Sequence, residues 1–271
     1  MAFVRFTASA DTTIVNAFQP NLITRGTGAN AGMADVVEVF SIYGRESSGS
    51  QELSRILLKF PIDEVSAQRT ANILPASGNV SYYLRLFNAP TSKTTPRDYS
   101  LVVAAVTKDW QEGVGLDLEG YTDLTKGNTG ANWMSASDTQ AWSNVGGDYL
   151  LTSDYYYTKA FENGLGNLEL DVTPLIERWI AGDQTNYGVI IKLSSSYEAS
   201  ASMDYVAQDD TVVYDPTGST KSYYTKRFFA RGSQYWFKRP QLEARWDDAT
   251  RDDRSNFYFS SSRAPAADNL N

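Results

Sequence analysis

The sequence predicts an all-β protein built as a jelly-roll-like β-sandwich, with one short helix and long ordered loops. Two observations predict this class. Short runs of β-branched and aromatic residues alternate with turns rich in Gly, Pro, Asn and Asp. Only one segment carries the apolar spacing and end signals of a helix. Hydrophobic residues make up 42% of the 271 residues, which is enough to bury a sizeable core.

The first half of the chain contains most of the clear strand signals. Residues 3–14 predict a strand followed by a bend, and the Gly- and Asn-rich residues 25–32 predict a loop. Further strands are predicted at residues 36–43, 54–61, 80–87 and 100–106. The last of these is a continuous apolar run, which indicates a strand buried on both faces.

A long loop and the helix follow. Residues 108–148 are dense in Gly, Asp and Asn but carry three tryptophans, which predicts an ordered loop. Residues 173–182 predict the helix: Thr173 suits the N-cap, Pro174 the first turn and Gly182 the C-cap. Ile176 and Trp179 share one face of this helix, which is expected to pack on the core.

The remaining strands complete the sandwich and set its boundary. They are predicted at residues 188–193, 212–214, 223–229 and 241–246. We therefore assign residues 1–246 to the β-sandwich domain and residues 247–271 to a C-terminal arm or linker. Residues 256–259 form one more potential strand within that arm.

Composition argues against several functions. The chain contains neither His nor Cys, which removes the commonest general base, metal ligand and thiolate nucleophile and predicts a protein that is not an enzyme. The net charge of −8 argues against nucleic acid as a partner. No apolar run is long enough to span a membrane, and the first residues lack signal-peptide features, so synthesis in a cytoplasm is expected.

Three segments resemble the family named for its DNRLRE domain. The first pairs residues 10–14 (ADTTI) with residues 54–60 (SRILLKF), and the second contains Trp110-Gln-Glu-Gly and a later Gly-Ala-Asn-Trp133. The third, residues 170–175 (LDVTPL), is followed by Trp179, Gly182, residues 186–188 and residues 239–243. The resemblance covers most of residues 8–246 and implies a jelly roll similar to carbohydrate-binding modules.

The resemblance also carries expectations about function. Similar stretches occur in structural proteins of tailed bacteriophages, and the arm at residues 247–271 resembles those proteins. This implies a non-enzymatic virion structural protein, such as a capsid decoration, collar or fibre-base module, located in the virion and contacting other virion proteins and copies of itself. The alternative is a carbohydrate-binding module for host-surface polysaccharide. A polysaccharide lyase or hydrolase using Tyr and carboxylates is a third hypothesis.

Acidic residues of the long loop are the only metal candidates that the pattern offers. Asp109, Glu112 and Asp117 could supply oxygen ligands to Ca²⁺. Their spacing matches no EF-hand, and a solvated acidic loop is the favoured interpretation. No other cofactor is indicated, and no residue is predicted to be catalytic.

Aromatic residues are the candidates for contact with a protein or a glycan, because exposed Tyr and Trp serve both kinds of surface. The candidates are Trp133, Trp142, Tyr155, Tyr156, Tyr157, Tyr235 and Trp236. Tyr155, Tyr156 and Tyr157 cannot all point inward, because neighbours on a strand face opposite sides. A basic and aromatic stretch at residues 223–239 could bind acidic sugars or single-stranded nucleic acid, although strand alternation alone also produces such a pattern.

Overall fold

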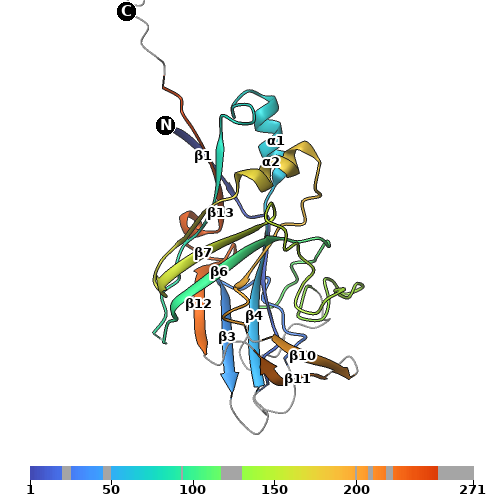
Figure 1. Ribbon diagram of the computed structural model, residues 1–271. Helices are drawn as coiled ribbons and strands as arrows, with labels where there is room; N and C mark the ends of the chain where they lie inside the picture. The colour runs from blue at the N-terminus through green and yellow to red at the C-terminus, as the bar shows by residue number, and fades with distance from the viewer. Residues whose placement is uncertain are drawn as a thin grey trace, which may run out of the picture.

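The computed structural model describes residues 1–19, 26–44, 50–92, 94–116, 130–198, 200–206, 210–217 and 222–249. For residues 43, 44, 50, 51, 200–206 and 210–217 only the backbone is described. The described chain is mostly β-structure, arranged in two antiparallel sheets that pack face to face (Figure 1). The predicted fold class, an all-β sandwich, is confirmed.

The larger sheet has seven strands. Its main path runs β12-β3-β4-β9-β6-β7, and β2 pairs with β4 off this path. The strands are β2 (Ala10–Val15), β3 (Val36–Gly44), β4 (Ser50–Lys59), β6 (Arg97–Ala105), β7 (Tyr156–Asn163), β9 (Val189–Leu193) and β12 (Tyr223–Phe229). The long strand β4 pairs with β3 through residues 50–53, with β2 through residues 54–59 and with β9 through residues 56–58.

The smaller sheet has four strands in the order β1-β13-β5-β8. They are β1 (Ala2–Thr7), β5 (Ser81–Leu86), β8 (Leu168–Asp171) and β13 (Gln241–Trp246). The first and last described strands of the chain are therefore hydrogen-bonded neighbours. A separate hairpin of β10 (Ser200–Val206) and β11 (Asp210–Thr217) lies at the end of the molecule away from the helices (Figure 1).

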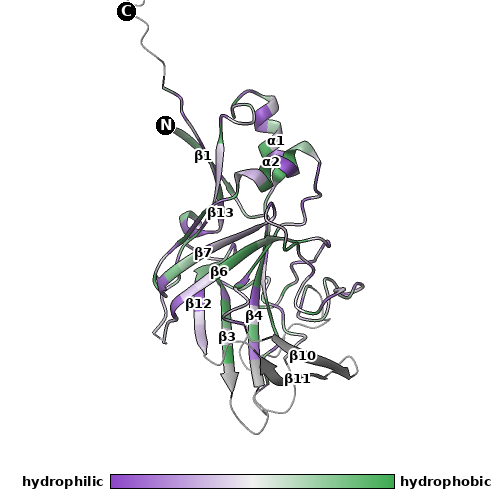
Figure 2. Cartoon of the chain, in the orientation of Figure 1, coloured by the Kyte–Doolittle hydropathy of each residue, from purple (hydrophilic) through white to green (hydrophobic). Residues whose placement is uncertain are grey.

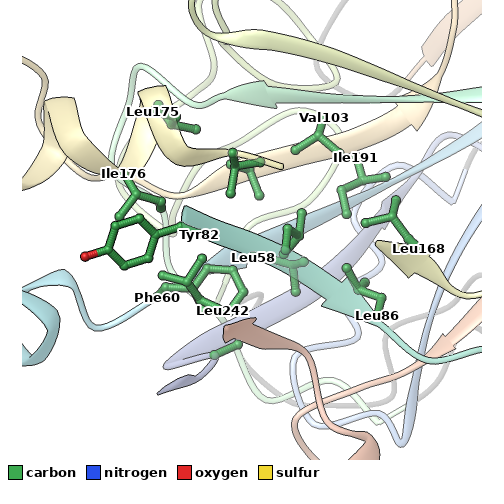
Figure 3. Close-up of a cluster of buried hydrophobic side chains, with 14 of the residues drawn as sticks. Leu58, Phe60, Tyr82, Leu86, Val103, Leu168, Leu175, Ile176, Ile191 and Leu242 are labelled. Atoms are coloured by element: carbon green, nitrogen blue, oxygen red, sulfur yellow. The ribbon is translucent and has the colours of Figure 1, made fainter. Parts of the chain in front are cut away.

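The sandwich core lies between the two sheets. Alternate residues of each strand point into it, as the pleat of a strand requires. Figure 3 shows Leu58, Val103 and Ile191 of the large sheet meeting Leu86 and Leu242 of the small sheet. At one end of this core Leu175 and Ile176 of α2 (Thr173–Ala181) close it above Tyr82 and Phe60.

A second core lies on the opposite face of the large sheet. The side chains of Leu57, Val102 and Ile190 alternate with the sandwich-core residues of the same strands and point the other way. The long loop covers them with Trp110, Trp133 and Trp142, which are all buried. The prediction that residues 100–106 are buried on both faces is confirmed, and Figure 2 shows β6 as hydrophobic over most of its length.

Helix α2 follows its sequence signals closely. Gly182 ends it with φ 81°, in the left-handed region that favours glycine. The start differs by one residue, because Thr173 is already helical and Val172 is the N-cap. Asp171 Oδ1 accepts hydrogen bonds from the Thr173 amide (2.9 Å) and hydroxyl (2.6 Å), so Asp171 is a structural acceptor at the helix start.

The prediction of a single helix was wrong, because a second helix precedes β5. Helix α1 (Ile62–Thr70) buries only Ile62 and Val65, so its sequence shows no continuous apolar face. Its position is fixed by a tertiary contact with α2. The Arg69 guanidinium donates to both carboxylate oxygens of Glu177, at 2.7 and 2.6 Å, and to the Tyr82 hydroxyl at 2.9 Å.

Candidate binding surface

Three loops that are far apart in sequence converge at one side of the molecule. They contain residues 26–35, 107–116 and 230–240, and the buried Asn30 side chain joins the first two. Its amide nitrogen donates to Thr12 Oγ1, Glu112 O and Ala131 O, and its Oδ1 accepts from the Gly32 and Gly115 amides. This one side chain thus fixes the relative position of two loops.

A polar cluster of Asp11, Glu112 and Arg231 joins the third loop to the other two. Arg231 donates to Glu112 through Nε (3.0 Å) and Nη2 (2.6 Å), and Glu112 Oε1 also accepts from the Asp11 amide at 2.9 Å. The Asp11 carboxylate accepts from the Arg231 amide. Asp11 is fully buried, and burial raises its pKa to about 7 against the opposing hydrogen bond from Arg231.

An exposed turn of three aromatic residues lies on this third loop. We call Tyr235, Trp236 and Phe237 the aromatic turn; their side chains are 44%, 71% and 51% exposed. Local bonds fix its backbone: the Tyr235 amide donates to Ser233 Oγ at 3.2 Å, and Gln241 Nε2 donates to Phe237 O at 3.0 Å. The aromatic rings are therefore presented to solvent on a fixed backbone.

Two cations border the aromatic turn. The Lys238 ammonium lies 5.0 Å from the Phe229 ring centroid, 5.4 Å from that of Tyr235 and 5.8 Å from that of Phe237. Within the described part of the chain, neither Lys238 nor Arg239 has a carboxylate within 4.0 Å. In a chain with net charge −8, this turn is locally cationic and aromatic.

The same three loops carry further exposed apolar side chains. Met33 is 50% exposed, Val114 49% and Leu116 67%. The Met33 amide donates to Gly115 O at 2.7 Å, and Gly232 lies so close to the carbonyl of Ala34 that a Cβ there would be only 2.8 Å from its oxygen. Six of the twelve large hydrophobic side chains that are exposed in the described chain thus lie on these loops.

The predicted surface aromatics occupy three different environments. Trp133 and Trp142 are only 1% and 5% exposed, so they support the second core and do not present a ring to a ligand. The side chains of Tyr155, Tyr156 and Tyr157 are half-buried: Tyr155 and Tyr157 contact the sandwich core, and Tyr156 contacts the second core. Tyr235 and Trp236 alone among these candidates are exposed at the surface.

The calcium candidates do not converge in the described structure. Asp109 pairs with Lys59 at 2.9 Å, and Glu112 is occupied by Arg231. Asp117 lies outside the described residues. Across those residues no group of three or more acidic side chains is placed to hold a metal ion.

The basic stretch at residues 223–239 divides between interior and surface. The side chain of Lys226 is buried, Arg227 pairs with Glu38 at 3.0 Å, and Arg231 pairs with Glu112. Only Lys238 and Arg239 remain beside exposed rings. Simple alternation does not account for the part on β12, because Lys226 is buried together with Phe228 and Phe229. The surface character begins after that strand ends.

Sequence reasoning missed the residues that hold the surface together. Asn30, Asp11 and Arg231 come from three distant segments. Asp11 lies in the ADTTI segment and Arg231 in the basic stretch, but nothing in the sequence places them together or beside Asn30. Phe237 carried a usable signal, because three consecutive aromatic residues followed by two cations cannot all be buried on a strand.

Comparisons with known proteins do not extend this description. No protein-family model matches the chain, and no curated protein matches it. No helix in the described ranges is long and apolar enough to cross a membrane.

Proposed function

We propose that this protein is a non-enzymatic structural protein of a tailed-bacteriophage virion, and that it acts through protein–protein contacts made by the aromatic turn. The observation that carries the proposal is the solvent exposure of Tyr235, Trp236 and Phe237 on a fixed backbone. Exposed aromatic residues beside cations are typical of interface centres, where Trp, Tyr and Arg supply most of the binding energy.

The chemistry of the chain supports a role without catalysis. It has no His and no Cys. Its most perturbed carboxyl group, Asp11, is fully buried beneath Arg231 and Glu112, where no substrate can reach it. A general acid or base must approach the proton that it transfers to within hydrogen-bonding distance. The virion assignment itself rests on the resemblance to phage structural proteins.

Incorporation into particles tests this proposal. Tagged full-length protein is expressed in the bacterial host while the phage that encodes it is produced there. The purified phage particles are then analysed by mass spectrometry. We expect the wild-type chain in the particles and a loss of at least tenfold in the Trp236→Ser, Phe237→Ser double variant. Tyr224→Ser is the matched control, since Tyr224 is 49% exposed but lies outside the aromatic turn. Absence of the wild-type chain from the particles would overturn the proposal.

A carbohydrate-binding role is the second candidate. The favouring observation is the Trp236 ring, 71% exposed, next to Lys238 and Arg239, which lack a carboxylate partner among the described residues. Aromatic faces stack on sugar rings, and free cations suit acidic sugars. Affinity electrophoresis in gels containing a neutral or a uronic-acid polysaccharide tests this candidate. Retardation that Trp236→Ala abolishes supports it, and equal mobility in all gels rejects it.

A further inference from the structure

Strand β1 has an open edge whose hydrogen-bonding groups can be assigned. The Ala8 amide donates to Pro240 O at 3.0 Å, in register with the pairing of Thr7 with Gln241. Hydrogen-bonded pairs alternate along an antiparallel ladder, so the groups of Phe6, Val4 and Ala2 also face β13. The amides and carbonyls of Phe3, Arg5 and Thr7 therefore point away from the sheet.

These outward groups have no hydrogen-bond partner among the described residues, because β1 is the first strand of its sheet. The strand contains no proline and no bulge, and its pairing with β13 is regular from Ala2 to Thr7. Such an edge is a template for another strand. Its inner face is also incompletely covered, since the side chains of Val4 and Trp246 are only half-buried against the sandwich core.

Hydrogen-bonded ion pairs hold the side chains of the small sheet in place as far as its edge strand β1. Arg5, Arg85 and Arg245 all donate to the Glu243 carboxylate, at 2.6, 2.7 and 2.6 Å. Burial by itself would raise the pKa of Glu243, but these hydrogen bonds lower it to about 2. The carboxylate therefore stays charged, and β1 remains tied to β13 while its outer edge is free.

A segment rich in strand-forming residues, which could add to this edge, follows the described residues in the sequence. Residues 256–260 read Asn-Phe-Tyr-Phe-Ser, with two phenylalanines on one face and a tyrosine on the other if the segment is extended. This segment follows Ala249 by seven residues, which can span about 25 Å at 3.3–3.6 Å per residue. The chain leaves the small sheet after Trp246, directly beside the start of β1, because Ala2 pairs with Trp246 and the Met1 amino group lies 2.8 Å from the Asp248 carboxylate.

We propose that the open edge of β1 accepts residues 256–260 of a second copy of this chain as an added antiparallel strand. A copy related by a two-fold axis can supply the antiparallel direction. The same chain would run parallel to β1 if it turned back directly at Ala2, and it could run antiparallel only with its linker extended along the whole of β1. Antiparallel pairs outnumber parallel pairs two- to three-fold. The inference rests on the proposed structural role and names a second copy as one of its partners.

Proline and its matched control test the acceptor edge in the full-length chain. Thr7→Pro removes an outward amide and leaves the bonds to β13 in place, whereas Thr7→Val keeps the amide and the branched shape. Sedimentation velocity over a concentration series should show self-association of the wild type and of Thr7→Val. Thr7→Pro should sediment as a monomer at every concentration.

A second variant, changed in the donated strand and called the donor variant, tests the proposal even if Thr7→Pro disturbs the fold. Phe257→Asp with Phe259→Asp should also sediment as a monomer, because it removes the apolar face of the donated strand. An equimolar mixture of this variant with Thr7→Pro should form a heterodimer, since one chain retains the donor and the other the acceptor. In wild type, amide exchange at Phe3, Arg5 and Thr7 should be slower than in the donor variant.

The outcomes separate this inference from the proposed function. A monomeric wild type, association of Thr7→Pro at the wild-type level, or a mixture that stays monomeric would overturn the strand exchange. Slow exchange at Phe3 and Thr7 in a monomeric wild type would show pairing within one chain and would also overturn it. None of these results alters the particle-incorporation result for Trp236 and Phe237, which are not part of the β1 edge.

Discussion

Lys226 is a buried cation held by oxygen atoms alone. Its ammonium donates to Asn88 Oδ1 at 2.5 Å and to the carbonyls of Gly164 and Gly166 at 2.7 Å each, which uses all three of its protons. Only 1% of the residue is exposed. The side chain therefore fastens the turn between β7 and β8 to β12.

Replacement of Lys226 should change the pH dependence of stability. Burial lowers the pKa of Lys226 from about 10.5 to about 7. Between those values the unfolded chain binds more protons at this site, so the free energy of unfolding rises with pH. We expect the wild type to gain stability relative to Lys226→Met from pH 7 to pH 9 in urea titrations. Lys159→Met, at a half-exposed lysine, is the control.

Asp11 should produce the opposite dependence. Burial raises the pKa of Asp11 from 3.8 to about 7, so between those values the folded chain binds more protons there than the unfolded chain. The stability contributed by this group is present below pH 4 and is lost as the pH rises to 7. In urea titrations, Asp11→Asn should therefore become more stable relative to wild type over that range. A constant difference over that range would contradict this account, and Asp138→Asn, at an exposed carboxylate, is the control.

At the scale of elements, the signals that are local in sequence predicted the structure well. Helix α2 has its proline, its apolar face and its terminal glycine within ten residues, and it forms where the sequence predicts. Helix α1 has no such face, and its contacts with Glu177 and Tyr82 come from distant residues. A single sequence does not reveal those pairings.

The candidate site was predicted only in part, for the same reason. Tyr235 and Trp236 stand out as consecutive aromatic residues. By contrast, Asp11 and Glu112 are 101 positions apart, and Arg231 is a further 119 positions from Glu112. Trp133 and Trp142 lie in a stretch rich in Gly, Asp and Asn, as surface aromatics often do, but their side chains cover the outer face of the large sheet. Composition cannot distinguish a tryptophan that a loop folds inward from one that it exposes.

The two classes of tryptophan should respond differently to substitution. Trp133 is buried in the second core, with the Arg55 guanidinium 4.9 Å from its ring centroid. Trp133→Ala should lower the free energy of unfolding by about 3–5 kcal/mol. Trp236→Ala should change it by less than about 0.5 kcal/mol, because the ring is exposed. Denaturant titrations of both variants check this, and equal losses of stability would place both rings in the core.

At the scale of the whole molecule, two cores share the same strands. Neighbouring residues of β4 illustrate this: Leu57 points into the second core and Leu58 into the sandwich core, and both are fully buried. The long loop is therefore a layer of the structure and not an appendage. Loss of one core removes the support of the other, which favours cooperative unfolding.

Leu57→Ala and Leu58→Ala form a matched pair that tests this coupling. Each substitution should lower the free energy of unfolding by about 2–5 kcal/mol and shift one common thermal transition. Differential scanning calorimetry should show a single heat-capacity peak in both variants. A second peak at lower temperature in Leu57→Ala alone would show that the loop layer unfolds independently of the sandwich.

The double burial of β4, β6 and β9 also limits how this sequence can diverge. A strand of an ordinary two-layer sandwich has a water-facing side on which substitutions accumulate at little cost. Residues 101–106 and 189–193 have no such side, because every one of their side chains is buried. Saturation mutagenesis should therefore find the least tolerance there, and much more at the edge strands β1 and β7. Natural variants of this chain are expected to differ mainly at β7 and on exposed turns other than the aromatic turn.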